Sequence, residues 1–121
     1  MADERFELPA GALEMMVLRS LSAGALHGYA IVRSIRDRSA DLLQVEEGSL
    51  YPALHRMERR GWVDAEWGTS ESNRRAKYYR LTRAGRSELK VRVATWGRLS
   101  GAIAQVLDPR PLGMGPLGHE A

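Results

Sequence analysis

The chain has 121 residues, no cysteine and a formal net charge of +3, with 44% hydrophobic and 27% charged residues. This length and composition suit one modest soluble domain, and the absence of cysteine excludes disulfides, thiolate metal sites and cysteine nucleophiles. No apolar run approaches the roughly 18 residues of a membrane span, and the acidic start lacks the pattern of a secretory signal, so we expect a cytoplasmic protein with no membrane contact.

Two helices are predicted before residue 40. In residues 12–22 the apolar side chains recur at helical spacing but cover more than one face, which predicts a helix buried on several sides. Gly24 ends this helix, and a second one is predicted over residues 29–39 with Ile31 and Ile35 on its core side. This second helix is amphipathic, because its arginines mostly face away from the core.

A third helix is predicted to start between Glu46 and Ser49, with Leu50, Leu54 and Met57 facing the core at i, i+4 and i+7. A start near Ser49 suits the proline that follows, whereas a start at Glu46 implies a local distortion, because proline fits only the first turn. The outward and flanking residues that remain for a partner are Ser49, Tyr51, Pro52, His55, Arg56 and Arg59.

A two-stranded hairpin follows the glycine at position 61. Residues 62–67 alternate between two faces, residues 68–75 form a polar loop, and residues 76–81 read as a returning strand with aromatic content. Tyr78 and Tyr79 lie on opposite faces, so one of them should pack in the core while the other reaches outward. The tip and its flank carry Asn73, Arg74, Arg75 and Lys77.

A long last helix is predicted over residues 83–107, capped by Thr82. Its seam steps by four, three, four, three and four residues through Leu89, Val93, Trp96, Ser100, Ile103 and Leu107. At 1.5 Å per residue such a helix is about 37 Å long, more than this small domain can cover, so we expect it to pair with a second copy of the chain. Residues 108–121 are rich in proline and glycine and are predicted to be disordered.

Charge is concentrated in one stretch. Residues 55–92 hold eleven lysines and arginines and five acids, a net +6, which leaves −3 for the remainder. The stretch is either a solvated basic face or a surface for a polyanion. The predicted fold is mostly α with a small two-stranded β wing: a winged helix-turn-helix over residues 8–81 that binds double-stranded DNA, followed by a dimerisation helix over residues 82–107.

Three separated blocks carry a family resemblance. They are Leu26-His27-Gly28-Tyr29-Ala30-Ile31, the block from Gly48 to Val63 that starts Gly-Ser-Leu-Tyr-Pro, and the block from Arg75 to Arg86. In order and spacing they resemble the signature blocks of the PadR family of transcriptional regulators, over about residues 8–107. The length is similar to that of the short subfamily with one dimerisation helix. The resemblance implies a repressor that leaves a pseudo-palindromic operator when a small effector, often a planar aromatic compound, binds.

The resemblance also suggests roles for single residues. It makes Tyr29 a candidate phosphate contact, with a hydroxyl at the edge of the core as the alternative, and it gives His27 a structural role. Glu46 and Glu47 stand where family members often carry serine or proline. They either complement the helix dipole, which we favour, or accept a hydrogen bond from a cytosine amino group.

The dimer contact is predicted to include Leu13 and Val17 of the first helix beside Leu89, Val93, Trp96 and Ile103 of the last one. Some relatives stack planar ligands on aromatic side chains of this helix, so Met15, Met16 and Trp96 are candidates for an effector pocket. The alternative is that Trp96 only fills space in the interface.

The sequence leaves two other classes of function to compare with DNA binding. An enzyme is disfavoured, because the three histidines lack metal-ligand spacing, no phosphate-binding glycine loop occurs, and no catalytic triad is suggested; we expect neither metal nor cofactor. The second alternative is a winged helix that contacts a protein partner instead of DNA. The salt dependence of DNA binding distinguishes this alternative from a DNA-binding winged helix.

Overall fold

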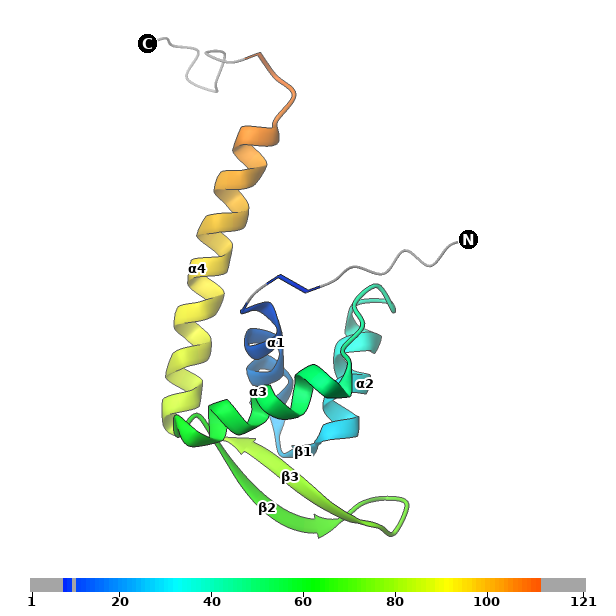
Figure 1. Cartoon of the computed structure of the whole chain (residues 1–121). Helices are drawn as coiled ribbons and strands as arrows, with labels where there is room; N and C mark the ends of the chain where they lie inside the picture. Colours follow the sequence, from blue (N-terminus) through cyan, green and yellow to red (C-terminus); the bar gives the residue numbers. More distant parts are fainter. Residues whose placement is uncertain (1–7, 10, 112–121) are drawn as a thin grey trace.

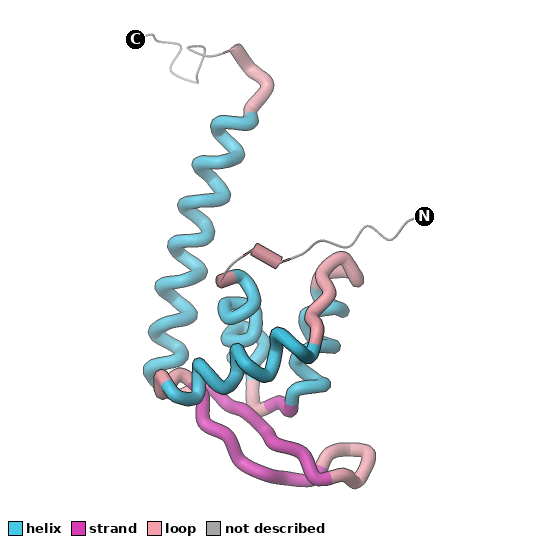
Figure 2. The backbone as a smooth tube through the Cα atoms, viewed as in Figure 1, coloured by secondary structure: helices cyan, strands magenta, loops and turns pink. Residues whose placement is uncertain are grey.

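The structure is a computed structural model that describes residues 8–9 and 11–111. Its elements in chain order are α1 (Ala12–Ser20), the short 3-10 helix η1 (Leu21–Ala23), β1 (Leu26–His27), α2 (Gly28–Arg38), α3 (Glu47–Arg59), β2 (Val63–Thr69), β3 (Arg75–Leu81) and α4 (Arg83–Leu107). Figures 1 and 2 show α1, α2 and α3 gathered into one body, with the β2–β3 hairpin below it and α4 rising past α1. The predicted winged helix-turn-helix with a long last helix is confirmed.

The core lies where the three helices meet the base of the hairpin. Its buried residues are Val17, Leu18, Leu21, Ile31, Ile35, Leu50, Ala53, Leu54, Met57, Val63, Tyr79 and Leu81. The three side chains of α3 that the i, i+4, i+7 spacing placed inward, Leu50, Leu54 and Met57, are fully buried. Burying a large aliphatic side chain contributes about 1.5–3 kcal/mol, so this stripe fixes which face of α3 remains outside.

The sheet has three strands, in the order β1-β3-β2, where the sequence predicted two. β1 pairs antiparallel with β3 through Leu26 opposite Tyr79 and His27 opposite Tyr78. A strand of two residues contains no alternation, so periodicity could not reveal it. Its consequence is that the wing is hydrogen-bonded directly to the residues that open α2. Of the two tyrosines, Tyr79 is the buried one, and Tyr78 donates its hydroxyl to the carbonyl of Thr69 at 3.1 Å.

The start of α3 differs from the arrangement that would suit its proline best. Glu46 is the N-cap and Glu47 the first helical residue, so Pro52 is the sixth residue of the helix, beyond its first turn. A proline there cannot donate to the carbonyl four residues earlier, which belongs to Gly48. Gly48 is exposed, so water can hydrogen-bond this carbonyl. The helix therefore begins at the early end of the predicted range, and Pro52 stands within it.

A junction at Thr82 joins α4 to the body. The Thr82 side chain accepts from the backbone N–H of Gly85 at 3.0 Å and donates to the carbonyl of Gly61 at 2.6 Å, and its N–H donates to the carbonyl of Trp62 at 3.1 Å. A Cβ on Gly85 would collide with that same Trp62 carbonyl, so this close approach requires glycine. The first turn of α4 is thus held against the α3–β2 turn.

Beyond its first three turns α4 stands apart from the body (Figure 1). Every residue from Val93 to Leu107 is exposed. None of the helices over residues 8–9 and 11–111 combines the length and apolar character needed to cross a membrane. The predicted division into a DNA-binding domain over residues 8–81 and a dimerisation helix from residue 82 coincides with the Thr82 cap of α4. The roles of the two parts stay predictions. Most of the segment predicted to be disordered, residues 112–121, lies outside the described residues.

Candidate DNA interface

The outward face of α3 consists of residues that the buried stripe leaves outside. Ser49, Tyr51, Pro52, His55 and Arg59 are all exposed, while Leu50, Ala53, Leu54 and Met57 on the other face are buried. The small and polar residues lie in the first half of the helix and Arg59 ends it. A helix that enters the major groove reads bases with its N-terminal residues, so this order of side chains suits such a helix.

Tyr51 packs over the start of α2. A Cβ on Gly28 would lie 2.8 Å from Cζ of the Tyr51 ring and 2.9 Å from its Cε1, closer than carbon atoms approach without displacement. Glycine at this position therefore lets the tyrosine ring lie across the α2 N-terminus. The first two signature blocks thus meet in space at this contact, and Tyr51 stays 46% exposed.

His27 caps α2. Its Nδ1 accepts the backbone N–H of Ala30 at 3.2 Å, which supplies one of the hydrogen bonds that a helix N-terminus lacks. The ring also meets Tyr78 edge-on at 5.3 Å. The structural role predicted for His27 agrees with these contacts.

The tip of the wing is an ordered turn. The N–H of Ser70 donates to the carbonyl of Arg74 at 2.8 Å, and the N–H of Asn73 donates to the carbonyl of Ser70 at 2.9 Å. Asn73 has φ of 61°, a left-handed conformation that asparagine tolerates better than most residues. The turn presents Asn73, Arg74 and Arg75 with exposed side chains.

Two cation–aromatic pairs face a common cleft. The Arg75 guanidinium lies 4.3 Å from the centre of the Trp67 ring on the wing, and that of Arg33 lies 5.3 Å from the centre of the Tyr29 ring on α2. The cleft has a volume of about 650 Å³, and residues of both pairs line it together with Tyr51 and Lys77. Tyr29 is 56% exposed, so its hydroxyl is not held at the edge of the core. Sequence reasoning did not single out Arg33 or Trp67. Arg33 follows Tyr29 by four residues on one helix, a spacing that the sequence does show, whereas Trp67 meets Arg75 only across the hairpin.

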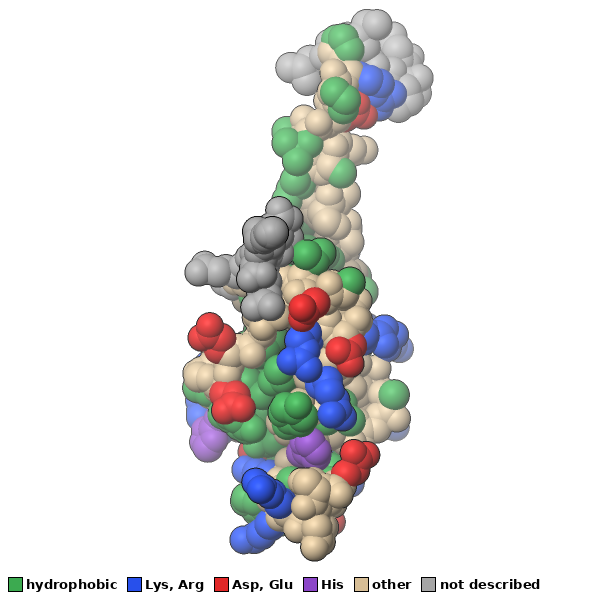
Figure 3. Space-filling view, turned by 90° about the vertical axis from the view of Figure 1, so that its right-hand side faces the viewer, with side chains coloured by type: hydrophobic (Ala, Val, Ile, Leu, Met, Phe, Trp, Pro, Cys, Tyr) green, Lys and Arg blue, Asp and Glu red, His purple; other side chains and the backbone are tan. Residues whose placement is uncertain are grey.

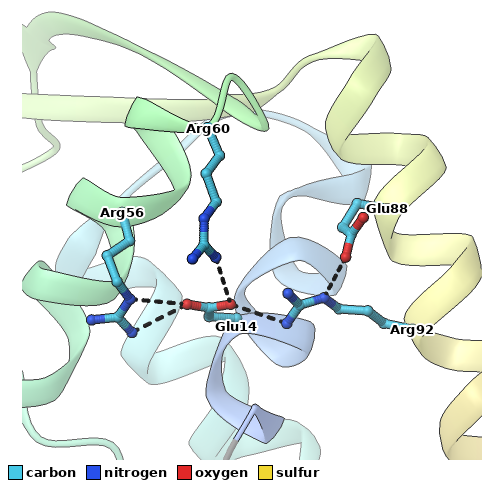
Figure 4. Close-up of polar contacts among 5 residues, drawn as sticks. All are labelled: Glu14, Arg56, Arg60, Glu88 and Arg92. Atoms are coloured by element: carbon cyan, nitrogen blue, oxygen red, sulfur yellow. Dashed lines mark hydrogen bonds and ion pairs between the residues drawn. The ribbon is translucent and has the colours of Figure 1, made fainter.

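Two of the predicted DNA contacts are engaged within the protein. Arg56 lies with Nη2 3.1 Å from Oε2 of Glu14, and its Nε donates to the same oxygen at 3.2 Å (Figure 4). Lys77 lies 3.5 Å from Glu58. Since a cation already paired with a carboxylate has less to gain from a phosphate, we leave Arg56 out of the interface and give Lys77 a secondary place in it.

Glu14 is the residue of this region that the sequence reasoning missed. It is the buried charged residue of the described chain, and arginines from α3 and α4 surround it. The available signal was an acid within a helix predicted to be buried on several sides, since a carboxylate there needs cationic partners.

Glu46 and Glu47 are exposed at the beginning of α3, and the Glu46 side chain makes no capping hydrogen bond. A carboxylate in the first helical turn interacts favourably with the helix dipole. Their position agrees with that role and leaves both side chains free to approach DNA.

The residues predicted for the dimer contact separate into three groups. Val93, Trp96 and Ile103 are 44–50% exposed on the projecting part of α4. Leu13 and Leu89 are partly buried against the core of their own chain. Val17 is fully buried, so it has no surface to offer a second chain and the prediction for it was wrong. It faces the core because it lies one turn after Leu13, on the side of α1 that packs against the other helices.

Two of the candidate effector residues are separate in the single chain. Met16 lines a small cavity of about 180 Å³ with residues of α1, α2 and the segment after α2, and Trp96 is not part of its lining. Met15 is partly buried on α1, while Trp96 is 44% exposed on α4. Within residues 8–9 and 11–111, no three histidine, aspartate or glutamate side chains gather as they would around a metal ion.

Comparison with known proteins agrees with this geometry. The chain is 28% identical over 99 residues to an uncharacterized protein X of Lysinibacillus sphaericus, a match that covers 82% of this chain and 91% of that protein. The crystal structure of a PadR family transcription regulator from Clostridium difficile matches with a TM-score of 0.70 at 28% identity, over 80% of this chain and 99% of the other.

The crystal structure of a PadR family transcriptional regulator from Eggerthella lenta is 33% identical, with a TM-score of 0.70, over 83% of this chain and 85% of that one. The family model described as the transcriptional regulator PadR-like family matches residues 17–91, which contain most of the winged helix and the first part of α4. These matches and the winged helix-turn-helix fold show that this chain belongs to the PadR-like family of transcriptional regulators and is a DNA-binding regulator.

Proposed function

We propose that the chain is a sequence-specific repressor that binds duplex DNA as a homodimer, with α3 in the major groove and the wing along the phosphate backbone. The observation that carries this proposal is the surface on which the outward face of α3 and the wing tip adjoin one cleft. The family regulates transcription, and we assign no catalytic role.

The first half of α3 is the part that reads bases. Ser49 and His55 have polar side chains that can hydrogen-bond base edges, and Tyr51 and Pro52 present apolar surface to a thymine methyl group. Arg59 lies at the end of the helix, where a cation meets phosphates rather than bases. Sequence preference is expected to differ from that of relatives at the bases near Glu46 and Glu47.

The wing and α2 supply the backbone contacts. Asn73, Arg74 and Arg75 lie on a narrow turn that can follow the backbone or enter the minor groove. Tyr29 lies across the cleft from them with an exposed ring. The phosphate backbone of a DNA strand in this cleft would meet Arg33 on one side and the wing arginines on the other. Such contacts raise the affinity for DNA and make that affinity depend on salt.

The projecting part of α4 supports the homodimer. Its apolar side chains Val93, Trp96, Leu99 and Ile103 are about half exposed. In Figure 3 charged side chains gather over the lower body, while the helix above it shows hydrophobic and uncharged surface. An apolar stripe of this length is buried when it pairs with the same stripe of a second copy. Two copies of α3 related by a two-fold axis would read a pseudo-palindromic operator.

Release by a small effector is the remaining part of the proposal. It is supported by the family and by Trp96, whose ring is 44% exposed on the stripe that the second copy would cover. A planar aromatic compound could stack there between the two chains. The opposing possibility is that Trp96 fills the interface by itself.

The salt dependence of DNA binding tests the central claim. A labelled fragment from upstream of the chain's own gene is titrated by fluorescence anisotropy between about 50 and 200 mM salt, a range over which phosphate contacts lose much of their affinity. We expect a steep loss, and Arg74→Ala should reduce the slope by about one unit for each bound copy.

Arg98→Ala is the matched control, because Arg98 is an exposed arginine on α4, away from the wing. Its salt slope should equal that of the wild type. If the wild type does not bind the fragment, or binds it with an affinity that does not change with salt, the winged helix contacts a protein instead of reading DNA.

A further inference from the structure

Glu14 is a buried carboxylate at the junction of three helices. The residue is 8% exposed and lies on α1, facing both α3 and α4. Burying a charge is unfavourable unless partners compensate it, so Glu14 needs the cationic groups around it.

The compensating groups come from two different helices (Figure 4). From α3, Arg56 binds Oε2 through Nη2 at 3.1 Å and Nε at 3.2 Å, and Arg60 just after the helix lies 3.9 Å from Oε1. From α4, Nη1 of Arg92 lies 3.0 Å from Oε1. One carboxylate therefore links the DNA-reading helix to the helix proposed for dimerisation.

The arginine on α4 is oriented by other contacts. Its Nε donates to Oε2 of Glu88, one helical turn earlier, at 2.8 Å. Its guanidinium also lies 4.9 Å from the centre of the Trp62 ring, beside the guanidinium of Arg60 at 5.2 Å from the same ring. Arg92 is only 23% exposed at its side chain, so these contacts are partly shielded from salt.

The cluster is the last of several contacts that fix the direction of α4. The Thr82 cap begins them, Arg86 donates to the carbonyl of Ser22 at 3.4 Å, and Leu89 packs against the core. Arg92 comes ten residues after Thr82, about 15 Å along the helix. From Val93 onward every described residue of the helix is exposed, so the Arg92 contact is the one nearest to the projecting part. A tilt of about 5° over a helix about 37 Å long displaces its end by about 3 Å, close to the ~3.4 Å step between base pairs.

We propose that Glu14 is a positioning residue that, through Arg92 and Arg56, sets the angle between α4 and α3 and thereby the spacing of the two half-sites that a DNA-bound dimer recognises. This inference rests on the proposed function for its DNA part. It assigns Glu14, Arg56 and Arg92 to the geometry of the dimer rather than to contact with DNA.

The main variant for testing it is Arg92→Gln. It disconnects α4 from the cluster while Glu14 keeps Arg56 and Arg60, so the buried charge remains compensated and the chain should fold. Arg92→Lys restores the charge and should recover part of the effect. Glu66→Gln is the matched control, since it breaks the exposed pair of Glu66 with Arg80 on the wing, which joins neither α3 nor α4.

The first measurement is on the protein alone. The chain has no cysteine, so His55→Cys on α3 and Gln105→Cys on α4 accept a pair of spin labels, and dilution with unlabelled chain isolates distances within one copy. We expect a narrow distance distribution in the otherwise unchanged chain and in the Glu66→Gln background, and a broader or shifted one with Arg92→Gln. An unchanged distribution in a folded Arg92→Gln protein overturns the positioning role.

The second measurement is on DNA. Sites are selected from a random library with the wild type, and affinities are then measured for the selected site, for a single half-site, and for versions lengthened or shortened by one base pair. Arg92→Gln should lose about tenfold at the selected spacing, a coupling of ordinary size, and should discriminate less between spacings, with its half-site affinity unchanged.

The outcomes separate the two proposals. Equal losses on the half-site and the full site, or a spacing preference like that of the wild type, overturn the positioning role and leave DNA binding intact. A wild-type chain that selects no DNA sequence overturns the proposed function and the DNA part of this inference together, whereas the spin-label result then still decides whether Glu14 orients α4.

Discussion

Gly28 determines where the side chain of Tyr51 lies. The glycine leaves room for the tyrosine ring, which covers the start of α2 and remains about half exposed beside the cleft. An added methyl group can push this ring aside, because its outer edge faces solvent. The contact therefore matters more for where Tyr51 points than for how stable the fold is.

Gly28→Ala is predicted to lower DNA affinity by about tenfold, the size of one lost groove contact, while the free energy of unfolding changes by about 1 kcal/mol or less. Anisotropy titrations and urea denaturation measure the two quantities. Tyr51→Ala should cause a similar loss of affinity, and adding Gly28→Ala to it should cost nothing further. Additive losses would show that Gly28 acts on DNA binding by another route.

Tyr79 connects the wing to the core and makes stability depend on pH in the alkaline range. Its ring is buried, and burial raises the pKa of its hydroxyl above the ordinary value of 10.0, with the charges of Glu58 and Tyr51 adding to the shift. Because the raised pKa belongs to the folded state, the contribution of Tyr79 is complete below pH 10 and is lost as pH rises towards its folded pKa.

Urea denaturation of the wild type from pH 8 to 11 should therefore show a loss of stability above about pH 10, and Tyr79→Phe should lose less over the same range. Tyr78→Phe is the control, since Tyr78 is only partly buried. Parallel pH profiles for the wild type and Tyr79→Phe would contradict this account.

At the scale of elements, sequence periodicity predicted which residues share a face of one helix or strand. The inward stripe of α3, the seam of α4 and the alternation of β2 follow from spacings of three, four or two residues. Contacts between distant parts of the chain could not be predicted this way. Glu14 meets Arg92 from 78 positions along the sequence, and His27 pairs with Tyr78 through a strand of two residues.

The same limit explains why two residues make contacts that were not predicted for them. Arg56 was assigned to DNA because it shares the outer side of α3 with His55, yet the fold brings Glu14 beside it. Val17 was assigned to the dimer contact because α1 is apolar on several sides, and spacing alone does not say which side meets the chain's own core. The exposed residues of the wing were predicted correctly as a basic tip because a polar loop between two strands has no core to enter.

The projecting part of α4 yields a prediction for assembly. Val93→Asp combined with Ile103→Asp places two charges on the apolar stripe, and charges there disfavour burial against a second copy. Multi-angle light scattering should report about twice the chain mass for the wild type and a single chain mass for this variant. The fold of the body should persist, because both residues lie beyond the part of α4 that contacts it.

Val91→Asp is the matched control for that experiment. Val91 is 60% exposed on the same helix but points away from the seam, two residues before Val93. It should leave the dimer intact. A wild type that stays monomeric at micromolar concentration would refute the seam.

At the scale of the whole molecule, the signature blocks lie where elements join. Gly28 meets Tyr51 between the first two blocks, and Thr82 ties the third block to Gly61 and Trp62 at the end of the second. The chain thereby holds α3, the wing and the base of α4 in fixed relation, and leaves α4 beyond Arg92 as an apolar surface. The surfaces proposed for DNA and for a second copy therefore lie at opposite ends of the molecule.

If the proposed dimer and effector hold, this arrangement predicts that the response to the effector requires both copies of the chain. Trp96 lies on the apolar stripe, 14 residues after the junction at Thr82, and in the proposed dimer a planar ligand held there would contact both copies. In a background of Trp62→Phe and Trp67→Phe, the fluorescence of Trp96 should change with planar aromatic compounds, and the complex with DNA should weaken in parallel. Combining this background with Val93→Asp and Ile103→Asp should abolish the response, since the single chain offers Trp96 no second wall. A response that survives in the monomer would place the ligand elsewhere, and no response across a chemically broad panel would leave Trp96 as packing between the two helices.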